Sequence, residues 1–124
     1  MKKVIATENA PKAVGPYSQA IEVNGTLYIS GQIPVNPADG TVQEEITAAA
    51  HQSLKNIGAI LREAGMTYDN VVKTTVLLAD IADFKAVNEV YAEYFTGDKP
   101  ARACYQAAAL PLGVKVEIEA IAVR

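Results

Sequence analysis

The C-terminal segment 114–123 has an apolar residue at every second position from Val114 onward, and this pattern constrains the fold more than any other. Successive side chains of a strand point to opposite faces, so one face of this strand is wholly apolar. The apolar face holds Val114, Val116, Ile118, Ala120 and Ala122, and the opposite face holds Lys115, Glu117, Glu119, Ile121 and Val123. We expect the first face to lie under helices. The second mixes charge with large β-branched residues.

A hairpin and a long helix are predicted before this strand. Residues 17–23 alternate, Asn24-Gly25 is typical of a type I′ turn, and 26–30 returns as a β-rich run. From 44 to 64 the apolar residues recur at helical spacing, and Gly65 is a natural helix stop. The pattern also allows a short extra strand around Val4 and Ile5.

A second strand–helix–strand pattern follows. Residues 71–78 predict a strand, and either Asp80 or Asp83 is expected to cap a helix that Gly97 and Pro100 close. The buried stripe of this helix is predicted to be Phe84, Val87, Tyr91 and Tyr94. A short strand at about 101–107 then precedes the last strand.

These elements predict an α+β fold, a mixed α/β sandwich in one domain over residues 1–124, with one mixed sheet and two helices on one face. Two helices cover only one face of a sheet, so apolar residues remain on the other. Because large exposed apolar patches mark interaction sites, we expect a homo-oligomer packed through the helix-free face.

Composition narrows the function classes. One Cys and one His exclude an intrachain disulfide framework and a His/Cys metal cluster within one chain, so no metal ligand is expected. Eleven scattered basic residues against fourteen acidic ones give a net charge of −3, which does not favour nucleic acid as a partner. No membrane-spanning run or signal peptide is visible, and a cytoplasmic protein is expected.

Three candidate chemical groups lie near the C-terminus, each with a plain alternative. Arg102, just after Pro100, could clamp a substrate carboxylate; the plain alternatives are a solvated arginine at a strand edge, or an interface salt bridge with Glu117 or Glu119. The two glutamates share a face and could divide acid and base roles, or simply pair across strands. Cys104 could be a thiolate whose pKa Arg102 lowers, or a small buried apolar residue.

Two further residues remain ambiguous from the sequence. Tyr17 follows Gly15-Pro16 at an expected strand start, where it is either a core aromatic or a lid over a pocket. His51 falls within the first helix and is expected on its surface. The residues alone therefore lead to an oligomeric domain with a candidate anion site.

Seven short segments, in this order and spacing, point further. They are Ile5-Ala6-Thr7 with Ala10-Pro11, Gly15-Pro16-Tyr17-Ser18-Gln19, Ser30-Gly31-Gln32-Ile33-Pro34, Val72-Lys73-Thr74-Thr75-Val76, Asn88-Glu89-Val90-Tyr91, Pro100-Ala101-Arg102-Ala103-Cys104, and Val116-Glu117-Ile118-Glu119-Ala120-Ile121-Ala122. With them the chain resembles the RidA (YjgF) family of reactive-intermediate deaminases over essentially its whole length.

The resemblance implies a chorismate-mutase-like fold and a homotrimer with three sites in the clefts between subunits. It implies hydrolysis of reactive 2-imino and enamine acids, such as 2-iminopropanoate and 2-iminobutanoate, to 2-oxo acids and ammonia. Such imines leak from pyridoxal-phosphate dehydratases and damage other enzymes of that type. The implied reaction needs no cofactor.

By the family pattern, Arg102 binds the substrate carboxylate, and Glu117 positions or deprotonates the attacking water. The backbone at Cys104 bonds the imine, and Tyr17 of a neighbouring subunit borders the pocket. The residues expected to line or support the pocket are Ser30, Gly31 and Asn88.

An alternative is a non-catalytic trimer that binds or senses small 2-oxo carboxylates through Arg102. A binder needs only that residue, so the presence of Glu117 as well favours an enzyme. Ribonuclease or chaperone-like activity fits poorly with the acidic balance and unclustered bases. The chain departs from the family pattern at Lys99 and at 105–107, which affects the preferred substrate side chain rather than the reaction class.

Overall fold

One six-stranded sheet forms the frame of the molecule. The computed structural model describes residues 1–124, and its strands lie in the order β1-β2-β3-β6-β4-β5. Their bounds are β1 (Lys3–Ile5), β2 (Ala20–Val23), β3 (Thr26–Gln32), β4 (Val71–Leu78), β5 (Ala101–Gln106) and β6 (Val116–Val123). The last strand of the sequence lies inside the sheet, antiparallel to both β3 and β4, whereas β4 and β5 are parallel. The sheet is therefore mixed, as predicted.

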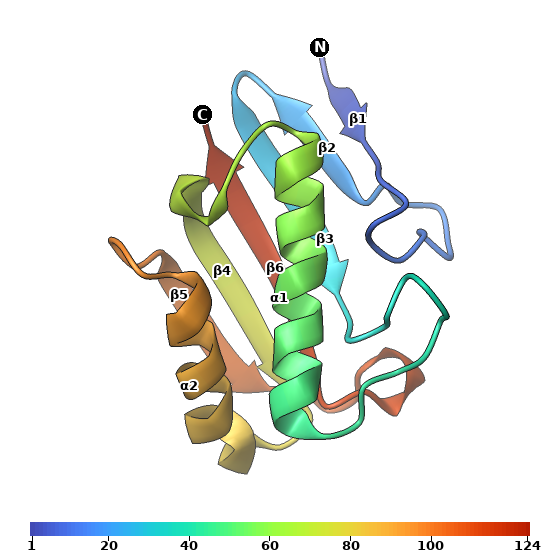
Figure 1. Ribbon diagram of the computed structural model, residues 1–124, viewed down its shortest axis with the longest axis vertical. Helices are drawn as coiled ribbons and strands as arrows, with labels where there is room; N and C mark the ends of the chain where they lie inside the picture. Colours follow the sequence, from blue (N-terminus) through green and yellow to red (C-terminus); the bar gives the residue numbers. More distant parts are fainter.

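Both helices pack on the same face of this sheet. In Figure 1, α1 (Ile46–Glu63) runs in front of the centre of the sheet, and α2 (Phe84–Tyr94) lies beside it over the β5 edge. The helix α2 forms the crossover that a parallel β4–β5 pair requires. Gly65, at φ 73°, follows the end of α1 in the left-handed conformation that favours glycine. The predicted fold class and helix stop are confirmed.

The strongest local signal, the hairpin turn, has the predicted geometry. Asn24 and Gly25 take φ of 51° and 79°, and a type I′ turn needs positive φ at both positions. The prediction that the first strand starts at Tyr17 is wrong, because β2 begins at Ala20. The Tyr17 amide instead donates to the Gly15 carbonyl over 2.8 Å, so the chain bends there.

The second helix differs from its sequence prediction in two details. Asp80 accepts a hydrogen bond from the Ala82 amide and caps a short 3₁₀ turn before α2, whereas Asp83 makes no such bond. Phe84 is 38 % exposed and does not belong to the buried stripe. It is the first residue of α2, at the end of the sheet, and Val90 and Phe95 are buried along the helix instead.

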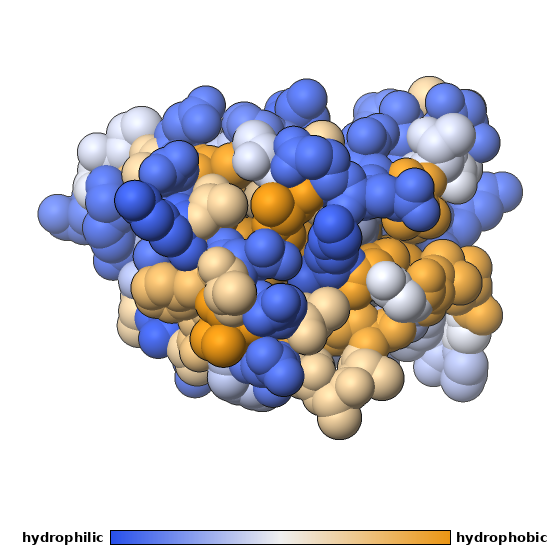
Figure 2. Space-filling model, turned by 90° about the horizontal axis from the view of Figure 1, so that it is seen from below, coloured by the Kyte–Doolittle hydropathy of each residue, from blue (hydrophilic) through white to orange (hydrophobic).

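The alternation in the last strand divides the molecule into two faces. Every residue of its predicted apolar face is buried beneath the helices, although the strand itself begins at Val116 rather than residue 114. Figure 2 looks at the end of the sheet with the helix side at the top: hydrophilic residues cover most of the upper half, and apolar residues gather below. The exposed apolar residues on the helix-free face include Tyr28, Tyr105 and Val123.

Membrane-spanning helices and clusters of metal-binding side chains are two features that the composition does not favour. No helix has both the length and the apolar character needed to cross a lipid bilayer. No three or more His, Cys, Asp and Glu side chains gather where they could share a metal ion.

We predict that Ile118→Ala lowers the free energy of unfolding by about 2–5 kcal/mol, because it leaves a cavity in the fully buried centre of the sheet. Urea denaturation at one fixed protein concentration measures this change. The control is Val4→Ala in the exposed edge strand β1, expected to change stability by no more than about 0.5 kcal/mol. Equal losses in the two variants would contradict the central role of β6.

A candidate active site in two halves

The strand register places the predicted site residues on opposite faces of the sheet. Thr74 of β4 lies opposite Arg102 on one side and opposite buried Ala120 on the other. Leu77 lies opposite Glu117. Paired residues point to the same face, and positions an odd number apart on a strand point to opposite faces. Arg102 therefore points to the helix side and Glu117 to the helix-free side. The two cannot meet, or form an ion pair, within one chain.

The helix-face half-site is built around Arg102 at the start of β5. Its Nη1 donates to Asn88 Oδ1 on α2 over 2.7 Å. The guanidinium carbon lies 4.8 Å from the centre of the Tyr91 ring and 5.4 Å from that of Phe84, which is cation–π geometry. Arg102 is itself exposed, and Asn88 takes only one of its five N–H donors. The arrangement presents a held cation that can accept a carboxylate.

Cys104 shares this face, and its surroundings favour a protein-packing role over a thiolate. Its side chain is half-buried and packs against the core. Burial raises the pKa of the thiol, and the lowering by nearby Arg102 does not offset it. Arg102 lowers the pKa of the thiol in the expected direction, but burial raises it by more, which favours the alternative of a small, partly buried residue.

The open-face half-site is built around Glu117 and Gly31. A Cβ added at Gly31 would overlap the Glu117 carboxylate, so a glycine is required for this close approach. The register of β3 shifts between Ile29 and Gln32, which places Ser30 and Gly31 in a bulge. Burial raises the pKa of Glu117, and the charge of Glu119 raises it further. A carboxylate with a raised pKa is suited to taking up a proton.

Ser30 and Tyr17 complete this half-site. The Ser30 hydroxyl donates to the Ser18 carbonyl over 2.6 Å, and its amide donates to the Gln19 carbonyl over 2.9 Å. These bonds tie the segment that carries Tyr17 to the bulge. Tyr17 is 50 % exposed and, with Gly31, lines a cavity of about 270 Å³, so it is not a core aromatic.

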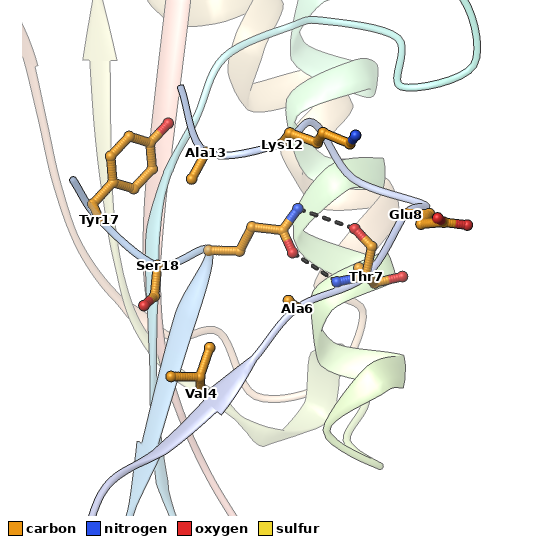
Figure 3. A pocket seen from close by; sticks show the side chains of 9 residues that line it. Val4, Ala6, Thr7, Glu8, Lys12, Ala13, Tyr17 and Ser18 are labelled. Atoms are coloured by element: carbon orange, nitrogen blue, oxygen red, sulfur yellow. Dashed lines mark hydrogen bonds between the residues drawn. The ribbon is translucent and has the colours of Figure 1, made fainter. Parts of the chain in front are cut away.

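Gln19 has a structural role that the sequence analysis did not assign. Its buried carboxamide accepts from the Thr7 amide over 2.7 Å and donates to the Thr7 and Pro11 carbonyls over 3.1 and 2.8 Å. Figure 3 shows the two bonds to Thr7 beside a cavity of about 490 Å³ that Tyr17 also lines. The sequence held one signal for this role: Gln19 is the polar amide in an alternating series with Tyr17, Ile21 and Val23.

Comparison with known proteins places the chain in a family. Residues 7–124 match the family model described as Endoribonuclease L-PSP. The chain belongs to this family. Two family relatives, from Mus musculus and Escherichia coli, are 58 % and 50 % identical over the whole chain and over 93 % and 99 % of their own lengths. Both are named 2-iminobutanoate/2-iminopropanoate deaminase, which confirms the RidA resemblance.

Solved structures of the family agree with the fold. The YjgF gene product of Escherichia coli is 50 % identical and superposes with a TM-score of 0.96 over 98 % of each chain. Escherichia coli TdcF with bound serine is 43 % identical, again with a TM-score of 0.96 over 98 % of each chain. A Rid family protein of Yersinia pestis reaches 0.97 at 51 % identity, with both chains fully covered.

We predict that Glu119→Gln lowers the pKa of Glu117, because it removes a neighbouring negative charge. The pKa should stay above the ordinary value for glutamate, since burial is the larger cause. NMR titration of the side-chain carboxyl carbons measures the shift. Glu22→Gln, at the ion pair with Arg124, serves as a control that leaves Glu117 unchanged. An unmoved Glu117 titration in Glu119→Gln would contradict the assigned cause.

Proposed function

We propose that the chain hydrolyses 2-imino acids, such as 2-iminopropanoate and 2-iminobutanoate, to 2-oxo acids and ammonia. The observation that carries this proposal is identity of 50–58 % over the full chain to relatives named for that activity. Two groups of the chain support it: a cation at Arg102 held by Asn88, and a carboxylate at Glu117 with a raised pKa.

In the proposed mechanism, Arg102 fixes the substrate by its carboxylate. Charge-assisted hydrogen bonds from a guanidinium to a carboxylate are each worth about 1.5–3 kcal/mol. The bond to Asn88 and the aromatic rings beside the guanidinium already restrict the orientation of Arg102. Substrate binding therefore costs less conformational entropy. The reacting imine carbon is thereby held at one place.

Water attacks that carbon with the help of Glu117. A protonated imine is already electrophilic, so orientation and one proton shuttle supply the chemistry. Glu117 takes a proton from the water as its oxygen bonds to carbon, and the electron pair of the C=N bond moves to nitrogen. Glu117 then passes this proton to nitrogen, and the hydroxyl group on carbon loses its own proton to Glu117. The C=O bond forms as the C–N bond breaks, ammonia leaves, and the last proton is released to solvent. The backbone at Cys104 is the proposed contact for the imine nitrogen.

A complete site requires two copies of the chain. Arg102 with Asn88 and Cys104 lies on the helix side, and Glu117 with its neighbours lies on the helix-free side. We propose a homotrimer in which each cleft joins the helix-face half-site of one subunit to the open-face half-site of the next. Glu117, Gly31, Ser30 and Tyr17 belong to the second of these. The apolar residues left on the helix-free face support such packing.

The ligand class has separate support. The structure of TdcF is described with bound serine, which carries the carboxylate that Arg102 is proposed to hold. A binder of 2-oxo acids would also use Arg102, but it would not need a carboxylate with a raised pKa against Gly31. The proposed location is the cytoplasm, whose reducing conditions keep a lone thiol such as Cys104 free.

We predict that Arg102→Ala abolishes turnover and that Glu117→Gln lowers kcat more than it raises KM. The first change removes the carboxylate partner, and the second removes proton transfer while keeping the shape. A pyridoxal-phosphate dehydratase acting on serine or threonine generates the imine, and semicarbazide traps what survives. Arg62→Ala, an exposed arginine on α1, is the control and should match the parent protein. If the parent does not deplete the trapped imine, the deaminase proposal is wrong.

We further predict that inactive subunits complement each other. Arg102→Ala and Glu117→Gln chains, unfolded together and refolded as an equal mixture, should form sites that combine an intact Arg102 with an intact Glu117 from different chains. Random mixing places both in about a quarter of the sites, so about a quarter of parental activity should return. Each variant refolded alone is the control. Mixed oligomers without recovered activity would contradict a site shared between subunits.

A further inference from the structure

Tyr91 connects the helix-face half-site to the centre of the sheet. Its ring lies on α2 at 4.8 Å from the guanidinium carbon of Arg102. Its hydroxyl is 2.7 Å from the hydroxyl of Thr74, which is buried on β4. The ring also packs against Phe95, with ring centres 4.5 Å apart. Contacts with β4, with β5 and with the residue that follows α2 therefore fix this ring.

Arg102 needs such support because of where it sits. It lies on an edge strand, its side chain is exposed, and arginine loses much rotamer freedom when it is ordered. The bond to Asn88 restrains one N–H group but leaves the guanidinium plane free to turn about it. A flat aromatic ring beneath the guanidinium restricts that rotation.

Thr74 and Arg102 are direct neighbours in the β4–β5 register. The hydrogen bond with Thr74 therefore anchors Tyr91 to the part of the sheet that also carries Arg102. The other buried residues of α2, Val87 and Val90, fill the core without any polar atom. A buried hydroxyl pair carries a desolvation cost that simple packing at this position would not require.

We propose that Tyr91, held by Thr74, is a positioning residue that sets the guanidinium plane of Arg102 for the substrate carboxylate. This inference rests on the proposed function. Tyr91 itself contacts no reacting atom in it: the ring acts only through Arg102, so its loss weakens substrate capture rather than the chemical step.

The test compares Tyr91→Leu with Tyr94→Leu, which removes a ring from the same helix where it packs against His51 and Tyr68 instead of Arg102. Tyr91→Leu should raise KM about tenfold and change kcat by less than about twofold, in line with loss of one cation–π contact. Tyr94→Leu should leave KM at the parental value. An unchanged KM in Tyr91→Leu, or an equal rise in both variants, overturns the proposal.

Conservative variants cover the case in which Tyr91→Leu does not fold. Tyr91→Phe keeps the ring and Thr74→Val keeps the strand shape, but each breaks the same hydroxyl pair. Both should raise KM about threefold, while Tyr94→Phe, which removes the hydroxyl bonded to His51, should not. No rise in either Tyr91→Phe or Thr74→Val overturns the role given to Thr74.

Binding of 2-oxobutanoate, measured by calorimetry, separates this inference from the proposed function. If the parent shows no turnover but binds 2-oxobutanoate, the deaminase proposal fails, and a tenfold weaker binding by Tyr91→Leu still supports the positioning role. Equal binding by the two proteins, or no binding by either, overturns it. If the parent turns over imines and Tyr91→Leu matches it in KM, the function stands and the inference fails.

Discussion

Two helices can cover only one face of a six-stranded sheet, and the remaining features of this molecule depend on that constraint. The strand β6 lies inside the sheet, and its two faces have different tasks. One face buries Ile118 and its neighbours beneath the helices and so contributes stability. The other face holds Glu117, which is half-buried beside Glu119. Burial and the like charge of Glu119 raise the pKa of Glu117. Alternate residues of one strand thus supply stability and, in the proposed function, the proton-accepting carboxylate.

The parallel pairing of β4 and β5 has a comparable double effect. A parallel pair cannot be joined by a tight turn, so the chain crosses the helix side through α2. The same crossover brings Asn88, Tyr91 and Phe84 against Arg102 at the start of β5. The connection that the topology demands therefore also supplies the surroundings of Arg102, the proposed substrate-binding residue. An arginine on a hairpin-connected edge strand would lack them.

Sequence periodicity predicted those features that depend on residues close together in the chain. The I′ turn at Asn24-Gly25, the long first helix and both faces of the last strand follow from it. The opposite orientation of Arg102 and Glu117 does not, because it depends on the register between strands that are distant in sequence. The resemblance to the family supplied the individual roles of the site residues, which no spacing rule yields.

Other features escaped prediction because side chains act on backbone far away in the sequence. The Gln19 carboxamide binds the backbone of residues 7–11; the pattern in 17–23 marks Gln19 as a polar residue but does not indicate these distant partners. Phe84 looked like a core residue by helical spacing, yet it lies at a helix start where Arg102 covers it.

The placement of Arg102 and Glu117 on opposite faces has a consequence for how activity responds to protein level. In the proposed assembly, an isolated subunit possesses every reactive group and still lacks a working cleft. Catalysis is then thermodynamically linked to association, so dilution below the dissociation constant of the assembly switches the enzyme off without damaging any chain. The specific activity of such a protein rises with its concentration until all subunits are assembled.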